Sequence, residues 1–406
     1  MENEHQISDK VLKRIKESEQ HLDKIRGSLF GGAVGDALGY TVEFWHERDI
    51  FDRLGPKGIQ QYIPDRRTGK ALISDDTQMT LFTANGILVG QTRAYLRGIG
   101  GKPSIYVPMS YQDWLMTQEM TFEERQKGKK VYQNCFSWLA DVPELYSLRA
   151  PGNTCLSALM LQKSGKDFEG SYIDHPVNRS KGCGGIMRVA PMGLVHMPYA
   201  GIRTIDREGA ELAAITHGHS LGYMPAAVLT HILSRIVYSG KEQLSLREIV
   251  LEARDTVAEI FGGDRHLRTL TDIIDSAVAL SENKESDLDN IHRLGEGWIA
   301  EETLGISVYC ALRHQNDFSA GVIAAVNHSG DSDSTGAVTG NILGAWLGFD
   351  AIEDKWKENL ELSDVILEMA DDLCHGCQMS EYSSYRDQDW IRKYVHMQWK
   401  DTGSRT

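Results

Sequence analysis

Apolar residues recur along this chain mainly at the three- and four-residue spacing of amphipathic helices. In the run that starts at Trp298, for example, Ala300, Leu304, Val308 and Ala311 would share one helix face. Alternating runs typical of strands are few, and no tight hairpin signal joins them. The pattern therefore predicts an all-α fold with long connecting loops. The same spacing predicts further helices over residues 76–90, 207–217, 223–238, 244–262, 267–281 and 364–374.

Two segments, residues 91–135 and 145–185, have the weakest periodicity and are rich in Gly, Pro, Ser and Tyr. Connecting segments carry binding residues more often than the elements they join. We therefore expect a binding pocket to be built from these two segments.

Glycines recur every four residues in the helix expected after Thr335, at Gly336, Gly340 and Gly344, and so lie on one face. Each glycine costs a helix about 1 kcal/mol relative to alanine, so we expect another backbone to approach this face closely. Packing in the middle of the bundle would explain the glycines. It would also point the loop of residues 331–334 at the centre of the protein.

Acidic and hydroxyl side chains cluster where two helices are expected to begin, in Asp331-Ser-Asp-Ser and in Ser74-Asp-Asp-Thr. Such oxygen ligands favour Mg²⁺, Mn²⁺ or Ca²⁺ over zinc. If the fold brings the clusters together, their four aspartates would repel one another unless cations lay between them. Two solvated turns are the alternative interpretation. The four aspartates are Asp75, Asp76, Asp331 and Asp333.

A second helix rich in small residues is expected over residues 31–44, and it contains Asp36 and Glu43. Seven positions apart, the two would lie two turns along the same face. Acidic groups in so apolar a helix need partners. They are either part of a metal site or helix-end groups that accept from backbone donors, and we favour the metal site for Glu43.

The composition limits the class of protein. The chain has 406 residues, of which 41% are hydrophobic and 25% charged, so it can bury a sizeable core. Its net charge of −14 argues against nucleic acid or an anionic membrane as a partner. There is no long apolar run and no signal-peptide pattern, so we expect a soluble cytoplasmic protein.

Six scattered cysteines fit reduced thiols better than a disulfide framework. The motif Cys374-His-Gly-Cys377 has no second pair to complete a zinc site. We interpret it as two partly buried thiols near the end of a helix.

Six motifs occur in a fixed order along the chain: Gly35-Asp-Ala-Leu-Gly39 with Thr41-Val-Glu-Phe44, Ser74-Asp-Asp-Thr-Gln-Met79, Gly182-Cys-Gly-Gly-Ile-Met-Arg-Val-Ala-Pro191, Thr216-His217, Glu301-Glu302 and Asp331-Ser-Asp-Ser334. In this order they resemble the ADP-ribosylglycohydrolase family, which includes the glycohydrolase that activates dinitrogenase reductase and the ADP-ribosyl-arginine hydrolases. The resemblance runs from about Gly27 to the C-terminal helices.

The resemblance implies a compact orthogonal helical domain over residues 27–406, with residues 1–26 as an N-terminal helical extension. A binuclear centre of two Mg²⁺ or Mn²⁺ ions would lie at the base of a cleft that binds ADP-ribose. The family more often has Thr where Ser74 and Ser334 stand, but serine keeps the coordinating oxygen. The implied metal ligands are Ser74, Asp75, Asp76, Asp331, Asp333 and Ser334, and the implied substrate-binding residues are Asn153, Gly182, Cys183, Gly184, Gly185 and His217.

The chain departs from the family at two places. Cys183 stands where relatives often have Asn. The acidic residue that some members carry after the Gly152–Cys155 loop would fall near Ser157, which is not acidic. Proton transfer would then come from Glu43 or from a metal-bound carboxylate.

The implied reaction breaks a glycosidic bond to the distal ribose of ADP-ribose on a modified protein. Asp331 or Asp76 would orient the attacking water, and Glu43 would transfer the proton. The leaving group is expected to be arginine, with serine as the nearest alternative. The enzyme would counteract an ADP-ribosyltransferase or toxin.

Two other classes of function are open. The stripe of Val11, Ile15, Leu22 and Ile25 could bind a partner, so that an immunity protein blocks a toxin through residues 1–26. A two-metal phosphohydrolase would instead cut the diphosphate.

Overall fold

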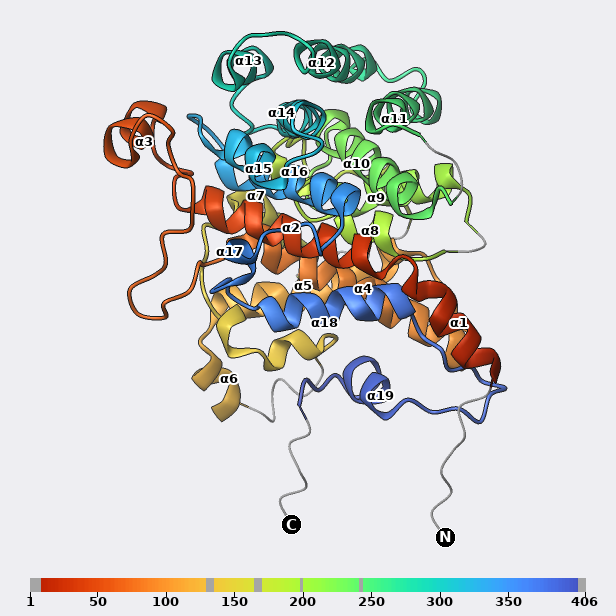
Figure 1. The fold of residues 1–406 in the computed structure, drawn as a ribbon. Coiled ribbons are helices and arrows are strands. Elements are labelled where there is room, and N and C mark those ends of the chain that lie inside the picture. Colours follow the sequence, from red (N-terminus) through yellow and green to blue (C-terminus); the bar gives the residue numbers. More distant parts are fainter. Residues whose placement is uncertain (1–8, 129–134, 164–169, 198–199, 241–243, 401–406) are drawn as a thin grey trace.

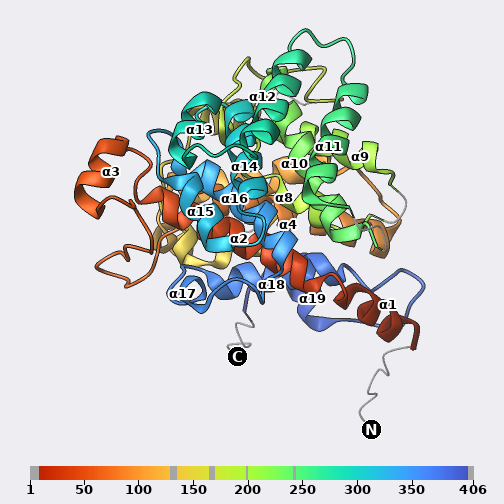
Figure 2. The same ribbon diagram turned by 45° about the horizontal axis from the view of Figure 1, so that its top comes forward.

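Two glycine-lined helices, α2 (Leu22–Tyr40) and α16 (Ser332–Leu347), cross the middle of the molecule side by side (Figures 1 and 2). They run antiparallel, because Gly27 lies against Gly344 and Gly35 lies against Gly336. A Cβ atom added at Gly35 would stand 1.9 Å from the carbonyl oxygen of Gly336. The predicted close approach of another backbone is therefore confirmed.

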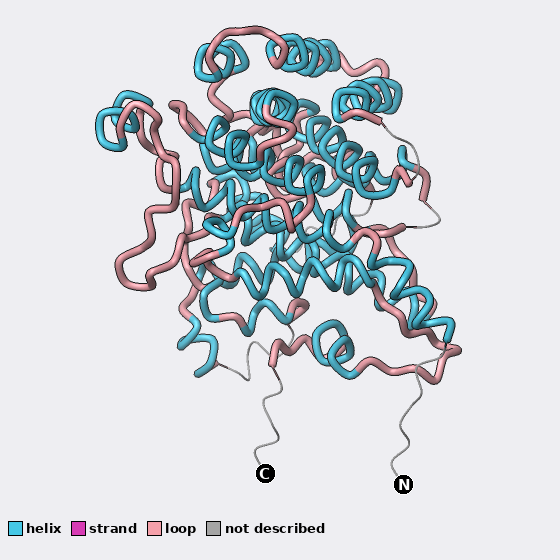
Figure 3. The backbone as a smooth tube through the Cα atoms, in the orientation of Figure 1, coloured by secondary structure: helices cyan, strands magenta, loops and turns pink. Residues whose placement is uncertain are grey.

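The all-α prediction is also confirmed in this computed structural model, which describes residues 9–128, 135–163, 170–197, 200–240 and 244–400 (Figure 3). Those residues form no β-strand, and their two isolated bridges join Ala71 to Leu360 and Gly182 to Ile299. The other α-helices are α1 (Asp9–Glu19), α3 (Glu47–Leu54), α4 (Asp75–Arg97), α5 (Pro103–Glu119), α6 (Phe122–Lys127), α7 (Asn153–Lys163), α8 (Ala190–Leu194), α9 (Ile202–Ala214), α10 (Ser220–Tyr238), α11 (Leu246–Ile260), α12 (Leu267–Leu280), α13 (Asp287–Leu294), α14 (Ala300–Arg313), α15 (Phe318–Val326), α17 (Asp354–Lys357), α18 (Ser363–His375) and α19 (Gln388–Tyr394), and the 3₁₀ helices are η1 (Trp138–Asp141), η2 (Pro143–Leu145) and η3 (Cys183–Gly185).

The central pair is covered from all sides. Helices α10, α14 and α15 pack against one side of it and α4 and α18 against the other, while α11, α12 and α13 form an outer layer beyond α10 and α14 (Figure 1). The whole of α16 from Ser332 to Ala345 is buried. The N-terminus of α16 therefore starts inside the protein, as the glycine pattern predicts.

The weakly periodic segments contain more helix than we predicted. Helix α5 fills much of 91–135, although it includes Pro108, and α7 lies within 145–185. Helix α5 is buried on several sides, through Tyr106, Tyr111 and Trp114 among others. A helix surrounded by protein needs no polar face, so it gives no amphipathic signal.

Helix α1 lies on its own domain. Val11 and Ile25 of the N-terminal stripe are buried, and the Cys374 thiol of α18 donates to the Ser18 carbonyl at 3.2 Å. Helix α2 continues unbroken across the boundary expected after residue 26. These contacts explain the stripe without a partner. Partner binding by the arm stays a prediction, and residues 1–8 lie outside the described part of the chain.

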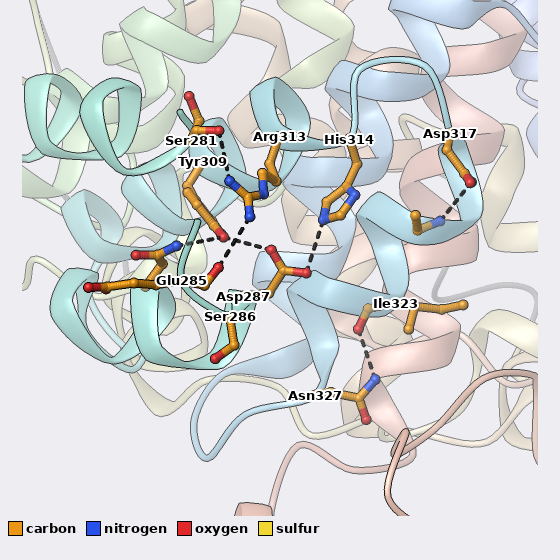
Figure 4. A network of polar contacts seen from close by, with 12 residues as sticks. Ser281, Glu285, Ser286, Asp287, Tyr309, Arg313, His314, Asp317, Ile323 and Asn327 are labelled. Atoms are coloured by element: carbon orange, nitrogen blue, oxygen red, sulfur yellow. Dashed lines mark hydrogen bonds and ion pairs between the residues drawn. The ribbon is translucent and has the colours of Figure 1, made fainter. Parts of the chain in front are cut away.

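The outer layer is tied to α14 by a polar network (Figure 4). Asp287 accepts hydrogen bonds from the Tyr309 hydroxyl at 2.6 Å and from Nε2 of His314 at 3.1 Å. Arg313 donates to the carbonyls of Ser281 and Glu285 at 3.3 and 3.2 Å. Burial alone would raise the pKa of Asp287, but the bonds from His314 and Tyr309 outweigh it, so the pKa is lowered.

Across the described ranges, no helix combines the length and the apolar character that crossing a membrane requires.

Candidate functional site

The N-terminus of α4 is built around Ser74. As the N-cap residue, Ser74 accepts from the Asp76 amide at 3.1 Å through its hydroxyl. From α2, Asp36 accepts from the backbone amides of Ser74 and Thr77 and from the Thr77 hydroxyl. Asp36 is therefore a helix-end group that holds α4 in place. Burial raises its pKa to about 6 in spite of these bonds.

The N-terminus of α16 is held in a similar way. Its N-cap residue, Asp331, accepts from the Ser334 amide at 3.2 Å, and its own amide donates to the Glu296 carbonyl at 2.8 Å. Gly330 has a φ of 139°, and a Cβ there would lie 2.0 Å from the Glu296 oxygen. Only glycine suits this position. Glu302 of α14 completes the support, since it accepts from the Glu296 amide at 3.0 Å.

The two helix starts converge, which the two acidic clusters in the sequence left open. Burial raises the pKa of Asp76 well above its usual value, and the charges of Asp36, Asp75 and Asp331 raise it further, although Ser334 donates a hydrogen bond to it. Burial and neighbouring carboxylates likewise raise the pKa values of Asp75 and Asp333. Carboxylates this close cannot all be ionised without a compensating charge.

Glu43 joins the cluster from beyond the end of α2. The helix ends at Tyr40, so the prediction of a helix through residue 44 was wrong. Two β-branched residues, Thr41 and Val42, follow Tyr40, and the Val42 amide closes a tight turn on the Gly39 carbonyl at 2.8 Å. Glu43 nevertheless faces the cluster: burial and then the charges of Asp331 and Asp75 raise its pKa to about 9.

Two carboxylate oxygens in the cluster have no hydrogen-bond partner although they are buried. They are Oε2 of Glu43 and Oδ2 of Asp76. Unpaired buried oxygens of this kind suit a hard divalent cation. Within the described ranges, no three His, Cys, Asp or Glu side chains are arranged closely enough to hold a metal ion as they stand. The donor chemistry fits the predicted metal centre, and metal binding itself stays a prediction.

The glycine-rich loop of residues 182–185 lies beside the start of α14. The amide of Cys183 donates to the Trp298 carbonyl at 3.2 Å, and the Ala300 amide donates to the Lys181 carbonyl at 2.9 Å. Lys181 also pairs with Glu301 at 2.5 Å. The thiol of Cys183 donates to Oδ2 of Asp331 at 2.7 Å. The loop is therefore attached to the acidic cluster through Cys183.

His217 lies beneath this loop, almost fully buried. Its ring is so close that a Cβ on Gly184 would stand 2.9 Å from Cε1 of His217. Nδ1 is 2.8 Å from the Thr216 hydroxyl, which accepts from Arg188 at 2.6 Å. Burial, and then the charge of Arg188, lower the pKa of His217 to about 3, so the ring is neutral. Its direct contact is with the glycine loop, and substrate binding by His217 stays a prediction.

Asn153 opens α7 and is exposed, beside the cluster. The backbone amide of its neighbour Gly152 hydrogen-bonds Asp75. Ser157 is exposed one turn further on, and its hydroxyl donates to the Thr154 carbonyl at 3.2 Å. The cluster therefore gains no carboxylate from position 157, in keeping with the second departure from the family.

Comparison with known proteins identifies the family of the chain and supports its fold. The sequence pattern of the ADP-ribosylglycohydrolase family matches residues 17–383. The chain belongs to the ADP-ribosylglycohydrolase family. Members of this family are hydrolases that act on glycosyl bonds.

Individual relatives agree with this assignment. The glycohydrolase is 23% identical to the human ADP-ribosylhydrolase ARH3 over 84% of this chain and 90% of that protein. It is 24% identical to the ADP-ribosylarginine hydrolase Tri1 of Pseudomonas putida, over 87% of this chain and 79% of that protein. A solved structure titled "ADP-ribosylglycohydrolase-related protein complex" has the same fold, with a TM-score of 0.57 and 22% identity over 88% of this chain and 98% of that one.

Two residues that support the glycohydrolase site, Arg149 and Glu361, have no recognisable signal in the sequence. Arg149 pairs with Glu361 at 3.0 Å, and Glu361 accepts from the Ile73 amide at 3.2 Å. The Arg149 carbonyl in turn accepts from the Asp75 amide at 3.1 Å. The pair thus fixes the segment that leads into α4. Each partner is an ordinary charged residue in the sequence, and only the fold brings the two together.

Two exposed aromatic rings flank the glycohydrolase cluster. Phe44 follows Glu43 in the chain, and Trp298 accepts from the amide of Cys183 through its carbonyl. Their rings stack with centroids 6.4 Å apart and planes 25° apart, and 71% of Phe44 is exposed. Large exposed aromatic rings often mark binding surfaces, but only the fold shows that these two rings are exposed and stacked.

Proposed function

We propose that this glycohydrolase removes ADP-ribose from arginine residues of modified proteins with the help of two Mg²⁺ or Mn²⁺ ions. The observation that carries the proposal is the pair of buried, unpartnered carboxylate oxygens on Glu43 and Asp76. When bound, two such cations would hold the ribose hydroxyls and activate a water molecule. The residues that would hold them are Ser74, Asp75, Asp76, Asp331, Asp333 and Ser334.

The remaining groups have separate tasks in this proposal. Asp76 and Asp331 orient the attacking water. Glu43 sits on a turn rather than within a helix and supplies the proton to the leaving group. The backbone of residues 182–185 binds the ribose and phosphates, because glycines let N–H groups approach an anion closely.

Arginine is the leaving group that fits the surroundings best. The exposed Phe44 and Trp298 rings provide flat aromatic surfaces beside the cluster. A guanidinium is planar and cationic, so it is attracted to the faces of such rings. A serine hydroxyl gains nothing from them. The similarity to Tri1, whose name specifies ADP-ribosylarginine, supports the same choice. In a cell, the activity would remove the ADP-ribose that an ADP-ribosyltransferase or toxin attaches to its target protein.

Two matched peptides test the proposal, one with ADP-ribose on arginine and one with ADP-ribose on serine. We expect free ADP-ribose and unmodified peptide, released faster from arginine, in the presence of Mg²⁺ or Mn²⁺. Mass spectrometry separates this result from AMP plus a phosphoribosyl peptide, the products of a phosphohydrolase. Faster release from serine would overturn the arginine assignment, and AMP as the product would overturn the glycohydrolase mechanism.

A further inference from the structure

Cys183 places a sulfur atom in a cluster whose other donors are oxygens. Its backbone amide donates to the carbonyl of Trp298, in the segment that leads into α14. Its Sγ lies 2.7 Å from Oδ2 of Asp331, the N-cap residue of α16. The position of the sulfur is thus tied to that of the Asp331 carboxylate.

The sulfur also faces the other helix start. Cys183 interacts electrostatically with Asp76 and shares a hydrogen bond with Ser334. Asp76 is only 3% exposed and its Oδ2 has no hydrogen-bond partner. Asp76, Asp331 and the Cys183 sulfur are therefore candidate ligands of one cation.

We propose that Cys183 is an additional metal ligand, which raises the affinity of this centre for a thiophilic divalent cation such as Zn²⁺ or Co²⁺ while the oxygen ligands alone bind Mg²⁺ or Mn²⁺. The proposal rests on the metal centre of the proposed function. A metal–oxygen bond of about 2.0–2.2 Å and a metal–sulfur bond of about 2.3 Å allow one cation to bind both Asp331 and Cys183. Thiolate ligands favour Zn²⁺ and Co²⁺, whereas Mg²⁺ takes oxygen ligands. On binding, the thiol releases its proton to solvent.

Cobalt provides a readout that does not depend on activity. Co²⁺ is added to the metal-free protein, and absorption is recorded for the wild type, Cys183→Ser and Cys374→Ser. We expect a near-ultraviolet sulfur-to-cobalt charge-transfer band in the wild type that Cys183→Ser removes. Cys374→Ser is the matched control, because Cys374 belongs to the Cys374–Cys377 motif of α18 and donates instead to Ser18. This control is expected to keep the band.

A second measurement compares two metals. Equilibrium dialysis is expected to show that Cys183→Ser weakens Zn²⁺ binding by about 10- to 100-fold and changes Mg²⁺ binding by less than about 3-fold. Far-ultraviolet circular dichroism checks that the variant is folded. Equal losses for both metals would overturn the selectivity.

The failures of the two proposals can be told apart. Bound Co²⁺ without a charge-transfer band in the wild type would overturn the Cys183 proposal and leave the metal centre standing. A band that Cys374→Ser removes would place the sulfur ligand at the other motif and would also overturn it. If dialysis finds no Co²⁺, Zn²⁺ or Mg²⁺ bound, the metal centre itself is wrong, and the Cys183 proposal fails with it.

Discussion

Asp287 and Asp333 are both carboxylates in the first turn of a buried or partly buried helix, yet their surroundings differ in one respect. Asp287 accepts hydrogen bonds from Tyr309 and His314, and its pKa is lowered although burial opposes this (Figure 4). Burial raises the pKa of Asp333 well above its usual value, and Asp76, Asp331 and Glu43 raise it further. The helix terminus favours a negative charge in both cases. The hydrogen-bond donors and charges around each carboxylate therefore decide whether its pKa is lowered or raised.

The comparison separates two uses of a buried carboxylate. The α13–α14 network is complete, since the protein itself supplies the donors that Asp287 needs. The cluster at α4 and α16 lacks such donors for two of its buried carboxylate oxygens, and in the proposed function a bound cation supplies the compensating positive charge. The same change from carboxylate to amide should therefore act in opposite directions in the two regions. The predictions below test this contrast.

Loss of the bound cation should have the largest effect on the rate of ADP-ribose release. Asp75→Ala, or excess EDTA with the wild type, is expected to slow ADP-ribose release by at least about 100-fold, because the metal-held geometry supplies the electrostatic stabilisation. Asp287→Ala should stay within about 3-fold of the wild type when assayed below its melting temperature. Full activity of metal-free enzyme in EDTA would contradict the proposed centre.

Glu43→Gln should lower kcat by about 100-fold and leave KM nearly unchanged, since a proton-transfer group acts only in the transition state. Steady-state kinetics on an ADP-ribosylarginine peptide gives both constants. Binding of free ADP-ribose, measured by calorimetry, serves as the control. If kcat and the affinity for ADP-ribose fall together, Glu43 has a structural role.

Asp333→Asn should stabilise the metal-free protein. Because the folded-state pKa of Asp333 is raised, the folded state holds its proton more tightly than the unfolded state, so this group lowers stability as pH rises above its unfolded value. The gain in the free energy of unfolding from Asn should therefore be larger at pH 8 than at pH 5. Urea unfolding of both proteins at both pH values measures it.

The quantity to compare is the difference in unfolding free energy between the variant and the wild type at each pH. Buried histidines such as His217 have lowered pKa values, so they destabilise both proteins alike as pH falls through about 6.5. Saturating Mg²⁺ should abolish or reverse the gain. A variant that is less stable than the wild type at pH 8 without metal would show that the cluster is not strained by its own charges.

Asp287→Asn should destabilise the protein by about 1–2 kcal/mol, because the amide accepts less strongly from Tyr309 and His314. The lowered pKa of Asp287 means that its contribution is present above the unfolded pKa and is lost as pH falls through the folded value. Asp272→Asn, at an exposed i,i+4 pair with Arg268, is the control and should change stability by less than about 0.5 kcal/mol. Equal losses of stability from Asp287→Asn and Asp272→Asn would contradict the stabilising role of the hydrogen bonds to Asp287.

The features that could be predicted from sequence are those with a local signature. The four-residue spacing of Gly336, Gly340 and Gly344 predicted the close contact with another backbone. The hydroxyl and acidic residues at Ser74 and Asp331 predicted two helix N-termini. The central place of α16 made their convergence possible, and the fold decided it. Metal binding and the roles of the individual residues stay predictions, because the fold alone does not test them.

Other features depend on residues far apart in the chain. The end of α2 at Tyr40 was missed because Glu43 continues an apparent seven-residue repeat. Arg149 and Glu361 are 212 positions apart in the chain, and no local sequence pattern predicts that they pair. Helix α5 was missed because burial on several sides leaves no polar stripe to detect.

The contact between α2 and α16 also determines when the site can exist. The hydroxyl of Ser28 donates to the Asn341 carbonyl at 3.0 Å, and the Asn341 side chain donates back at 2.8 Å, across 313 positions of sequence. During synthesis, α2 leaves the ribosome long before the helix it must pair with, and closing so long a loop is slow. A nascent chain has only the Ser74–Asp76 half of the acidic cluster until α16 has emerged. The two halves of the acidic cluster can therefore come together only after most of the chain has been synthesised.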